Sequence, residues 1–215
     1  MSVSKIPKVT LLGKNRLAGP ERRRQILEQA KKLCAKKGFA GTTLDEIARE
    51  AGVSRALIVQ HFGSKTGLYE ALVDFLFKDH PMEDDPDLVE CIRARDDFGV
   101  FRAFSVHAFK HMVNDREQSP LRLIFFSILE NPHLYERHYQ QRRIKGISVL
   151  EEYISKRIEE GVFIEVNPYH VAVGFGAMVS QLLLQEVAVK DISDRNTFMS
   201  TIETMIQLLL NGLKK

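Results

Sequence analysis

TTLDEIAREAGVSRALIVQHFGSK, residues 42–65, contains the signals of two short helices joined by a tight turn. Thr43 stands three residues before Glu46, a spacing in which each side chain bonds the other residue's backbone amide at a helix N-terminus. Gly52 follows the first helix, where a left-handed residue is favoured, and Ser54 is placed to cap the second. This pattern predicts a helix-turn-helix whose second helix has the size to enter a DNA major groove.

The net charge of +3 is unevenly distributed along the chain. Residues 1–65 contain 14 of the 31 cationic residues and 5 of the 28 acidic ones, a net charge of +9, and the remainder carries −6. A basic segment that coincides with a helix-turn-helix is typical of a domain that binds a polyanion. We therefore expect the N-terminal part of the chain to bind DNA.

The whole chain reads as an all-α protein, because helical periodicity recurs and no alternating strand pattern stands out. We expect a flexible basic arm over residues 1–19, a DNA-binding domain over 20–78, and an acidic, proline-containing linker over 79–87. A larger helical domain over 88–215, for ligand binding and dimerisation, completes the chain. Its predicted helices cover residues 97–114, 120–130, 134–160, 168–189 and 193–213.

The composition is that of an ordinary globular protein, with 44% hydrophobic residues among 215. Cys34 and Cys91 have no metal-binding or redox spacing, and no long apolar stretch follows the N-terminal lysines, which favours a cytoplasmic location. Residues 171–189 are long enough to span a membrane. However, Gln181, Gln185 and Glu186 interrupt this run, so we expect no membrane span.

Motifs of the common enzyme classes are missing: the sequence has no nucleophile elbow, phosphate-binding loop, zinc motif or convincing acid–base pair. His107 and His111 are four residues apart, a spacing that can bind a metal on a helix. No glutamate or cysteine pattern completes such a site, although Asp115 continues the same face. We therefore predict that the protein is not an enzyme and holds neither a metal nor another cofactor.

Residues 21–77 resemble the DNA-binding domain of the tetracycline-repressor (TetR) family. The run GFAGTTLDEIAREAGVSRALIVQHFGSKTGLYEAL, residues 38–72, follows that family's pattern in its Gly-Phe, Thr-Thr, Ile-Ala, Ala-Gly-Val-Ser, His-Phe, Ser-Lys and Leu-Tyr motifs. The rest of the chain matches only in the number and order of its helices. The resemblance implies a dimeric transcriptional regulator whose helical body binds a small-molecule effector.

The resemblance also implies roles for individual residues at the DNA. Thr43 would offer its hydroxyl and the helix N-terminus to a phosphate, and Arg55 would bind guanine O6 and N7. The remaining expected contacts are a thymine methyl for Ala56 or Leu57, a base edge or phosphate for Gln60, and phosphates for His61 and Lys65. For the run Arg22–Arg24, a solvated helix face is favoured over phosphate contact.

One position departs from the family pattern. Val59 stands where most members have a tyrosine that touches a phosphate, and valine cannot donate that hydrogen bond. We therefore expect DNA binding to depend more on Lys65, on His61 and on the basic arm.

The last two helices carry the signals of a dimer interface. Residues 193–213 are apolar on two faces, and a helix of that kind needs two partners. Either face can be the outer one. We assign to a four-helix dimer interface, like that of the resembled family, the residues Ala172, Gly176, Phe198, Ile202, Met205 and Leu209.

An effector pocket in residues 88–215 is implied by the resemblance. Six of the 13 phenylalanines fall between residues 98 and 126, which makes this region the expected wall and a largely apolar or aromatic molecule the expected effector. His107 or Gln181 would supply polar contacts. The candidate lining residues are Phe101, Phe104, His107, Phe125, Phe126, Tyr139, Phe175 and Met178.

The sequence therefore predicts a sequence-specific regulator that binds pseudo-palindromic double-stranded DNA as a homodimer. In the favoured mechanism it is a repressor, and its effector shifts helices toward the linker so that the recognition helices no longer match successive major grooves. Two alternatives remain open: activation instead of repression, and a DNA-binding protein without an effector that is architectural or controlled by a partner.

Overall fold

The computed structural model describes residues 19–77, 81–113, 120–130, 132–133, 136, 144–188 and 195–215. These residues form helices joined by turns, with one isolated antiparallel bridge between Phe163 and Lys214, which confirms the all-α prediction. The elements are α1 (Gly19–Lys37), α2 (Leu44–Ala51), α3 (Arg55–Phe62), α4 (Lys65–Phe77), the 3-10 turn η1 (Met82–Asp84), α5 (Pro86–Ala94), α6 (Asp97–Met112), α7 (Pro120–Glu130), α9 (Ile144–Glu159), α10 (Pro168–Ala188) and α11 (Arg195–Leu213).

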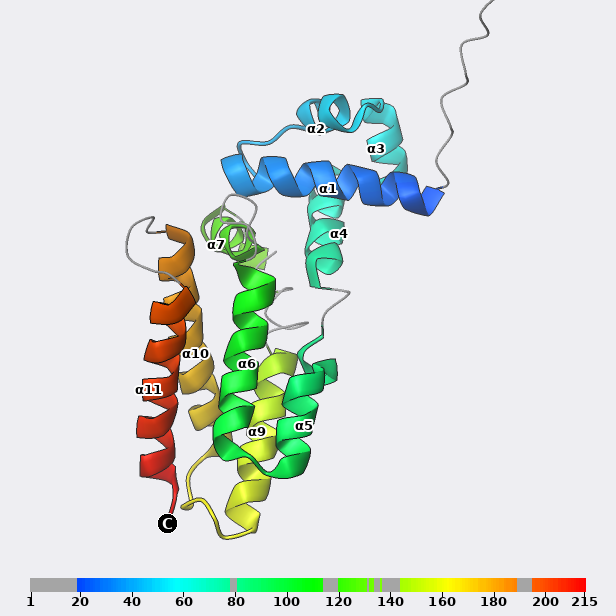
Figure 1. The fold of residues 1–215 in the computed structure, drawn as a ribbon. Helices are drawn as coiled ribbons and strands as arrows, with labels where there is room; N and C mark the ends of the chain where they lie inside the picture. Colours follow the sequence, from blue (N-terminus) through cyan, green and yellow to red (C-terminus); the bar gives the residue numbers. More distant parts are fainter. Residues whose placement is uncertain are drawn as a thin grey trace, which may run out of the picture.

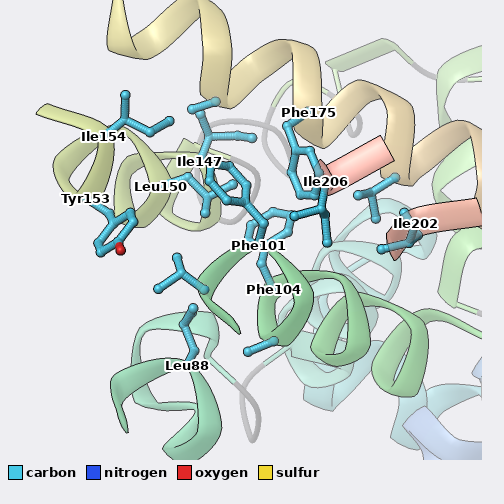
Figure 2. Close-up of a cluster of buried hydrophobic side chains, with 14 of the residues drawn as sticks. Leu88, Phe101, Phe104, Ile147, Leu150, Tyr153, Ile154, Phe175, Ile202 and Ile206 are labelled. Atoms are coloured by element: carbon cyan, nitrogen blue, oxygen red, sulfur yellow. The ribbon is translucent and has the colours of Figure 1, made fainter. Parts of the chain in front are cut away.

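Two hydrophobic cores organise these helices. Helices α1 to α4 form the head, whose core includes the fully buried residues Ile26, Ile47 and Ile58. Helices α5, α6, α9, α10 and α11 form the body, and Figure 1 shows the last four of these running side by side below the head. Figure 2 shows the centre of the body core, where Phe101 and Phe175 meet with ring centroids 4.9 Å apart.

The sequence did not predict η1 and α5, which lie partly within the expected linker. Asp85 caps α5 by accepting a hydrogen bond from the Leu88 amide, and Pro86 occupies the first helical position, which suits a residue without an N–H. Asp85, Pro86 and Asp87 of the expected linker therefore belong to a helix start. The basic arm, up to residue 18, and residues 134–135 and 137–143 of the predicted 134–160 helix lie outside the described residues.

The buried carboxylate of Asp97 connects α6 to α9 and to the residue that follows α11. Asp97, at the start of α6, accepts hydrogen bonds from the Tyr153 hydroxyl and from Nε of Arg157, both at 2.7 Å. Nζ of Lys214, beyond α11, lies 3.2 Å from the same carboxylate. Burial raises the pKa of Asp97, but the hydrogen bonds from Arg157, Tyr153 and Lys214 outweigh it and leave the pKa below its usual range.

Asp97→Asn is expected to lower the free energy of unfolding at pH 7 by about 2–4 kcal/mol, because the buried Arg157 loses the more deeply buried of its two carboxylate partners and keeps only Glu160. The native carboxylate has a lowered pKa. Its contribution is therefore complete above the unfolded-state pKa of about 4 and is lost as the pH falls through the native value. Urea denaturation at pH 7 and between pH 5 and pH 3 measures both effects.

The control is Glu90→Gln, an equivalent change at an exposed position of α5. A variant Asp97→Asn as stable as Glu90→Gln at pH 7 would contradict the assigned role.

Candidate DNA interface and effector cavity

The helix-turn-helix has the local geometry that its sequence predicts. Thr43 and Glu46 form a complete capping box, and Gly52 adopts the left-handed conformation with φ 63°. Ser54 caps α3 by accepting a hydrogen bond from the Leu57 amide at 3.2 Å. These contacts fix the angle between α2 and α3 through bonds within the stretch itself.

Side chains of α1 add a second set of restraints that the sequence did not reveal. Gln25 donates to the carbonyl of Ala51 at the end of α2, at 3.1 Å. Arg23 donates to the carbonyl of His61 at the end of α3, at 2.7 Å, and its guanidinium lies 4.3 Å from the centre of the Phe62 ring. Arg23 is therefore bound to α3, in contrast to the solvated face expected for the run. Basic and amide side chains often bind the last carbonyls of helices, but which helix they reach depends on the tertiary fold.

The predicted DNA contacts cluster on the outer side of α3 and at the ends of its neighbours. Arg55, Ala56 and Gln60 are exposed on α3, and Leu57 and His61 are half-buried. Val59, at the position of the family departure, is 41% exposed although it is apolar. The recognition helix thus offers a surface with one guanidinium, one amide and several apolar groups, which suits guanine edges and thymine methyls.

In the free protein, acidic side chains bind two of the residues that are predicted to contact DNA. Arg55 lies 3.6 Å from Asp45, and both side chains are more than 60% exposed. The Thr43 hydroxyl donates to Glu46 at 3.1 Å, and hydrogen bonds from Lys37 and Thr43 lower the pKa of Glu46 to about 2. Exposed pairs of this kind contribute little stability, so DNA can replace them at small cost.

Lys65 is also engaged within the head. Its ammonium donates to the carbonyl of Ala40 at 3.3 Å and lies 4.4 Å from the centre of the Phe39 ring. The side chain is half-buried and sits at the first residue of α4, beside the turn that follows α1. It is therefore held near α3 in an ordered position, where phosphate contact requires little further ordering.

The body contains a cavity of about 190 Å³ between η1, α6, α7, α9 and α10. Of the predicted effector-binding residues, the structure brings together Phe104, His107 and Phe125. Other lining residues that the sequence did not single out include Met82, Leu121, Ile124, Gly146, Gly176, Val179 and Ser180. Aromatic content pointed to the right helices, but most of the lining residues are aliphatic or small, and the aromatic count could not identify them.

The remaining predicted pocket residues lie elsewhere. Phe101 and Phe175 are buried in the body core, and Met178 packs against that core away from the cavity. Phe126 lies on the opposite side of α7, where its ring is 6.0 Å from the Arg122 guanidinium. Gln181, the alternative polar contact, is exposed, and Tyr139 lies outside the described residues. In the part of the chain that the structure describes, no group of three or more His, Cys, Asp or Glu is placed to bind a metal.

Comparison with known proteins agrees with this geometry. Residues 26–72 match the family model for bacterial regulatory proteins of the tetR family. The chain is 41% identical over 80 residues to the HTH-type transcriptional regulator TtgR of Pseudomonas putida, a match that covers 34% of this chain and 38% of TtgR. Residues 26–72 are therefore a DNA-binding domain of the TetR family.

Solved TetR-family structures share the fold at low sequence identity. PfmR of Thermus thermophilus is 20% identical with a TM-score of 0.66, and the match covers 88% of this chain and 99% of PfmR. AibR, solved with isovaleryl coenzyme A and operator DNA, is 22% identical with a TM-score of 0.62 and coverages of 86% and 97%. Both TtgR and PfmR are described as transcriptional regulators. The chain matches little more than a third of the length of TtgR.

Helix α7 carries both part of the cavity wall and a contact surface for the head. Leu121, Ile124, Phe125 and Ile128 line the cavity at the spacing of one helix face. On the other side, Leu123 is 2% exposed and lies in the head core. Figure 1 shows α7 lying directly beneath the C-terminal end of α1.

Among the residues that the structure describes, three hydrogen bonds join α7 to the head. The Tyr69 hydroxyl of α4 donates to the carbonyl of Leu123 at 2.8 Å. Nε of Arg122 donates to the carbonyl of Ala35 at 3.0 Å, at the end of α1. Glu130 accepts from the Ala40 amide at 2.8 Å. Helix α7 is therefore bonded to α4, to the end of α1 and to the turn that follows α1.

The structure corrects most of the predicted dimer residues. Ala172, Phe198 and Ile202 are at most 2% exposed within the single chain, since their side chains face the body core. A Cβ on Gly176 would meet Ile147 of α9, so this glycine permits close packing within the chain. Met205 is 36% exposed and Leu209 half-buried. Exposed residues on α10 and α11 include Gly174, Ala177 and Gln181 of α10 and Met205 and Leu208 of α11.

Helix α10 also meets the length and composition of a membrane-spanning helix, with a mean hydropathy of 1.5 over its apolar window. Its inner face, which includes Phe175, Val179 and Leu183, is buried in the body core. A core helix of this kind satisfies the same criteria without a membrane.

Arg55→Ala is expected to cost about 1–3 kcal/mol of binding to a selected operator and to relax the preference at one base pair, because a bidentate guanine contact is lost. The matched comparison is Lys65→Ala, which should weaken operator and random DNA equally and flatten the salt slope by about one unit. Titrations of both DNAs at several salt concentrations measure these effects. Equal losses on operator and random DNA for Arg55→Ala would remove its base-reading role.

Proposed function

We propose that the protein is a sequence-specific transcriptional regulator of the cytoplasm, most simply a repressor that an apolar or aromatic effector releases from its operator. The observation that carries this proposal is α3, which is exposed along its outer side and held in place by α1 and α2 within a basic head. The structure of the similar AibR with operator DNA and a coenzyme A ester supports it.

A second copy of the chain completes the proposed DNA-binding unit. One recognition helix reads too few base pairs for useful specificity, so two helices on a pseudo-palindrome are expected. The outward side of α10 and α11, where Gly174 and Ala177 adjoin Met205 and Leu208, offers the small and apolar groups that a four-helix contact needs. This surface replaces the one expected from the sequence alone.

Helix α7 supplies the proposed route from effector to DNA. A ligand that contacts Ile124 and Phe125 favours one position of α7. The head moves with α7 because Leu123 packs in the head core and hydrogen bonds join α7 to the head. The ligand acts only through its differential affinity for the two arrangements. The expected result is a change in the spacing of the two recognition helices and a loss of operator affinity.

Selection of random DNA at physiological salt, followed by titration with a panel of apolar and aromatic metabolites, tests this function. The expected result is a pseudo-palindromic site whose affinity falls with at least one metabolite, and reduced reporter expression from that site. Tight, unselective and ligand-insensitive binding would instead support an architectural or partner-controlled protein. Increased reporter expression would show an activator.

Removal of the polar contacts between α7 and the head should weaken the coupling between effector and DNA. Arg122→Ala combined with Glu130→Ala is expected to leave effector affinity unchanged and to reduce the effector-induced loss of operator affinity by about 0.5–2 kcal/mol. Operator titrations with and without saturating effector measure the difference.

Leu129→Ala is the matched control, because Leu129 lies on the same helix and is 81% exposed. Coupling that is equal in the double variant and in Leu129→Ala would exclude these contacts as the route.

A further inference from the structure

His107 stands out as a buried polar side chain in the wall of the cavity. It lies on α6, is 7% exposed, and its Nδ1 is 2.7 Å from Oδ2 of Asp85. The other carboxylate oxygen of Asp85 accepts from the Leu88 amide at 3.0 Å, as the cap of α5. The carboxylate is thus fixed by two partners, and the imidazole is fixed by the carboxylate.

This contact determines where the imidazole carries its proton. Burial raises the pKa of Asp85, but hydrogen bonds from His107 and from the α5 amides outweigh it and leave the pKa below its usual range. An ionised carboxylate can only accept, so Nδ1 of His107 must donate. In the neutral ring the other nitrogen, Nε2, then has a lone pair and acts as an acceptor.

The ring also has a defined orientation relative to the cavity. His107 lines the cavity, whereas Asp85 does not, so the side of the ring away from Nδ1 faces the cavity. Among the described residues, no hydrogen bond to Nε2 is found. The surrounding wall is apolar and includes Phe104, Ala108 and Phe125.

Ser180, another polar residue of the cavity wall, has the same polarity as Nε2 of His107. Its hydroxyl donates to the carbonyl of Gly176 at 2.7 Å, so the proton is used within α10 and the oxygen is left as an acceptor. The half-buried His111 also lines the cavity, with its ring centroid 4.4 Å from that of His107, whereas the charged lining residues Glu83 and Lys145 are exposed. At His107 and Ser180 a ligand thus meets acceptors within a largely apolar wall.

We propose that the cavity selects a largely apolar molecule bearing a hydroxyl donor, such as a phenol or enol, which donates to Nε2 of His107. This inference rests on the proposed function in taking the cavity as the effector site. A volume of about 190 Å³ exceeds that of an apolar cavity of about 150 Å³ known to hold benzene, so two fused rings are a suitable size. The hydroxyl distinguishes this class from purely apolar ligands.

The test uses three probes of one shape: 1-naphthol, its methyl ether 1-methoxynaphthalene, and naphthalene. Calorimetry on the full-length protein at pH 8, where imidazoles are ordinarily neutral, should show 1-naphthol binding at least tenfold more tightly than the ether. The ether cannot donate, so the preference reports the acceptor. Equal affinities, a preference for the ether, or no binding of any probe would overturn the proposal.

Asp85→Asn reverses the polarity of the site with little change in shape. The amide oxygen is needed to cap Leu88, so the amide NH₂ faces His107 and donates to Nδ1, which moves the ring proton to Nε2. The tenfold preference should fall to threefold or less. Asp87→Asn, the same change at an exposed position of α5, should retain it. A preference unchanged in Asp85→Asn would overturn the proposal.

Two parallel measurements separate this inference from the proposed function. Multiple-bond ¹⁵N correlation spectra report the tautomer of His107 directly and should show Nδ1 protonated in the native protein and Nε2 protonated in Asp85→Asn. Operator binding is measured on the same samples. Intact operator binding without a preference for 1-naphthol rejects the inference alone, whereas no selective DNA binding by the native protein rejects the proposed function.

Discussion

The packing of α7 into both hydrophobic cores is the constraint on which the rest of the structure depends. Leu121 belongs to the body core and Leu123 to the head core, because residues two apart point to opposite sides of a helix. A ligand at Phe125 therefore cannot move α7 without disturbing the packing of the head. Cores packed at crystal-like density do not deform smoothly, so the head responds by changing between discrete arrangements.

Features encoded by short-range spacing were predictable from the sequence. The caps at Thr43, Gly52 and Ser54 involve partners within a few residues, so the helix-turn-helix and its family could be recognised from one stretch. Helix α5 was missed although Asp85 and Pro86 carry the same kind of start signal, because its proline and acidic residues also have the composition of a linker. Only Leu88 is fully buried in α5, so its apolar periodicity is weak and the helix depends on packing against the body core.

Features that depend on tertiary packing could be predicted from the sequence only in part. The periodicity of the last helix showed two apolar faces, but the choice of the inner face depends on contacts such as Phe109 with Phe198, whose ring centroids are 4.7 Å apart. Similarly, the aromatic content indicated which helices form the cavity wall. However, Phe101 and Phe175 pack against each other and do not line the cavity. A composition count cannot distinguish a ring that lines a cavity from one that closes it.

The carboxylate of Asp85 binds both the start of α5 and the imidazole that lines the cavity. Asp85 caps α5 with one oxygen and holds His107 with the other, and it stands two residues after Glu83, which lines the cavity together with Met82. The segment that follows α4 therefore sets the proton position on the ring that faces the ligand. Since a ligand shifts a conformation only as far as its affinity differs between states, any withdrawal of Asp85 from His107 weakens the acceptor that a hydroxyl ligand requires. The proton position on His107 and the start of α5 are thus set by the same group.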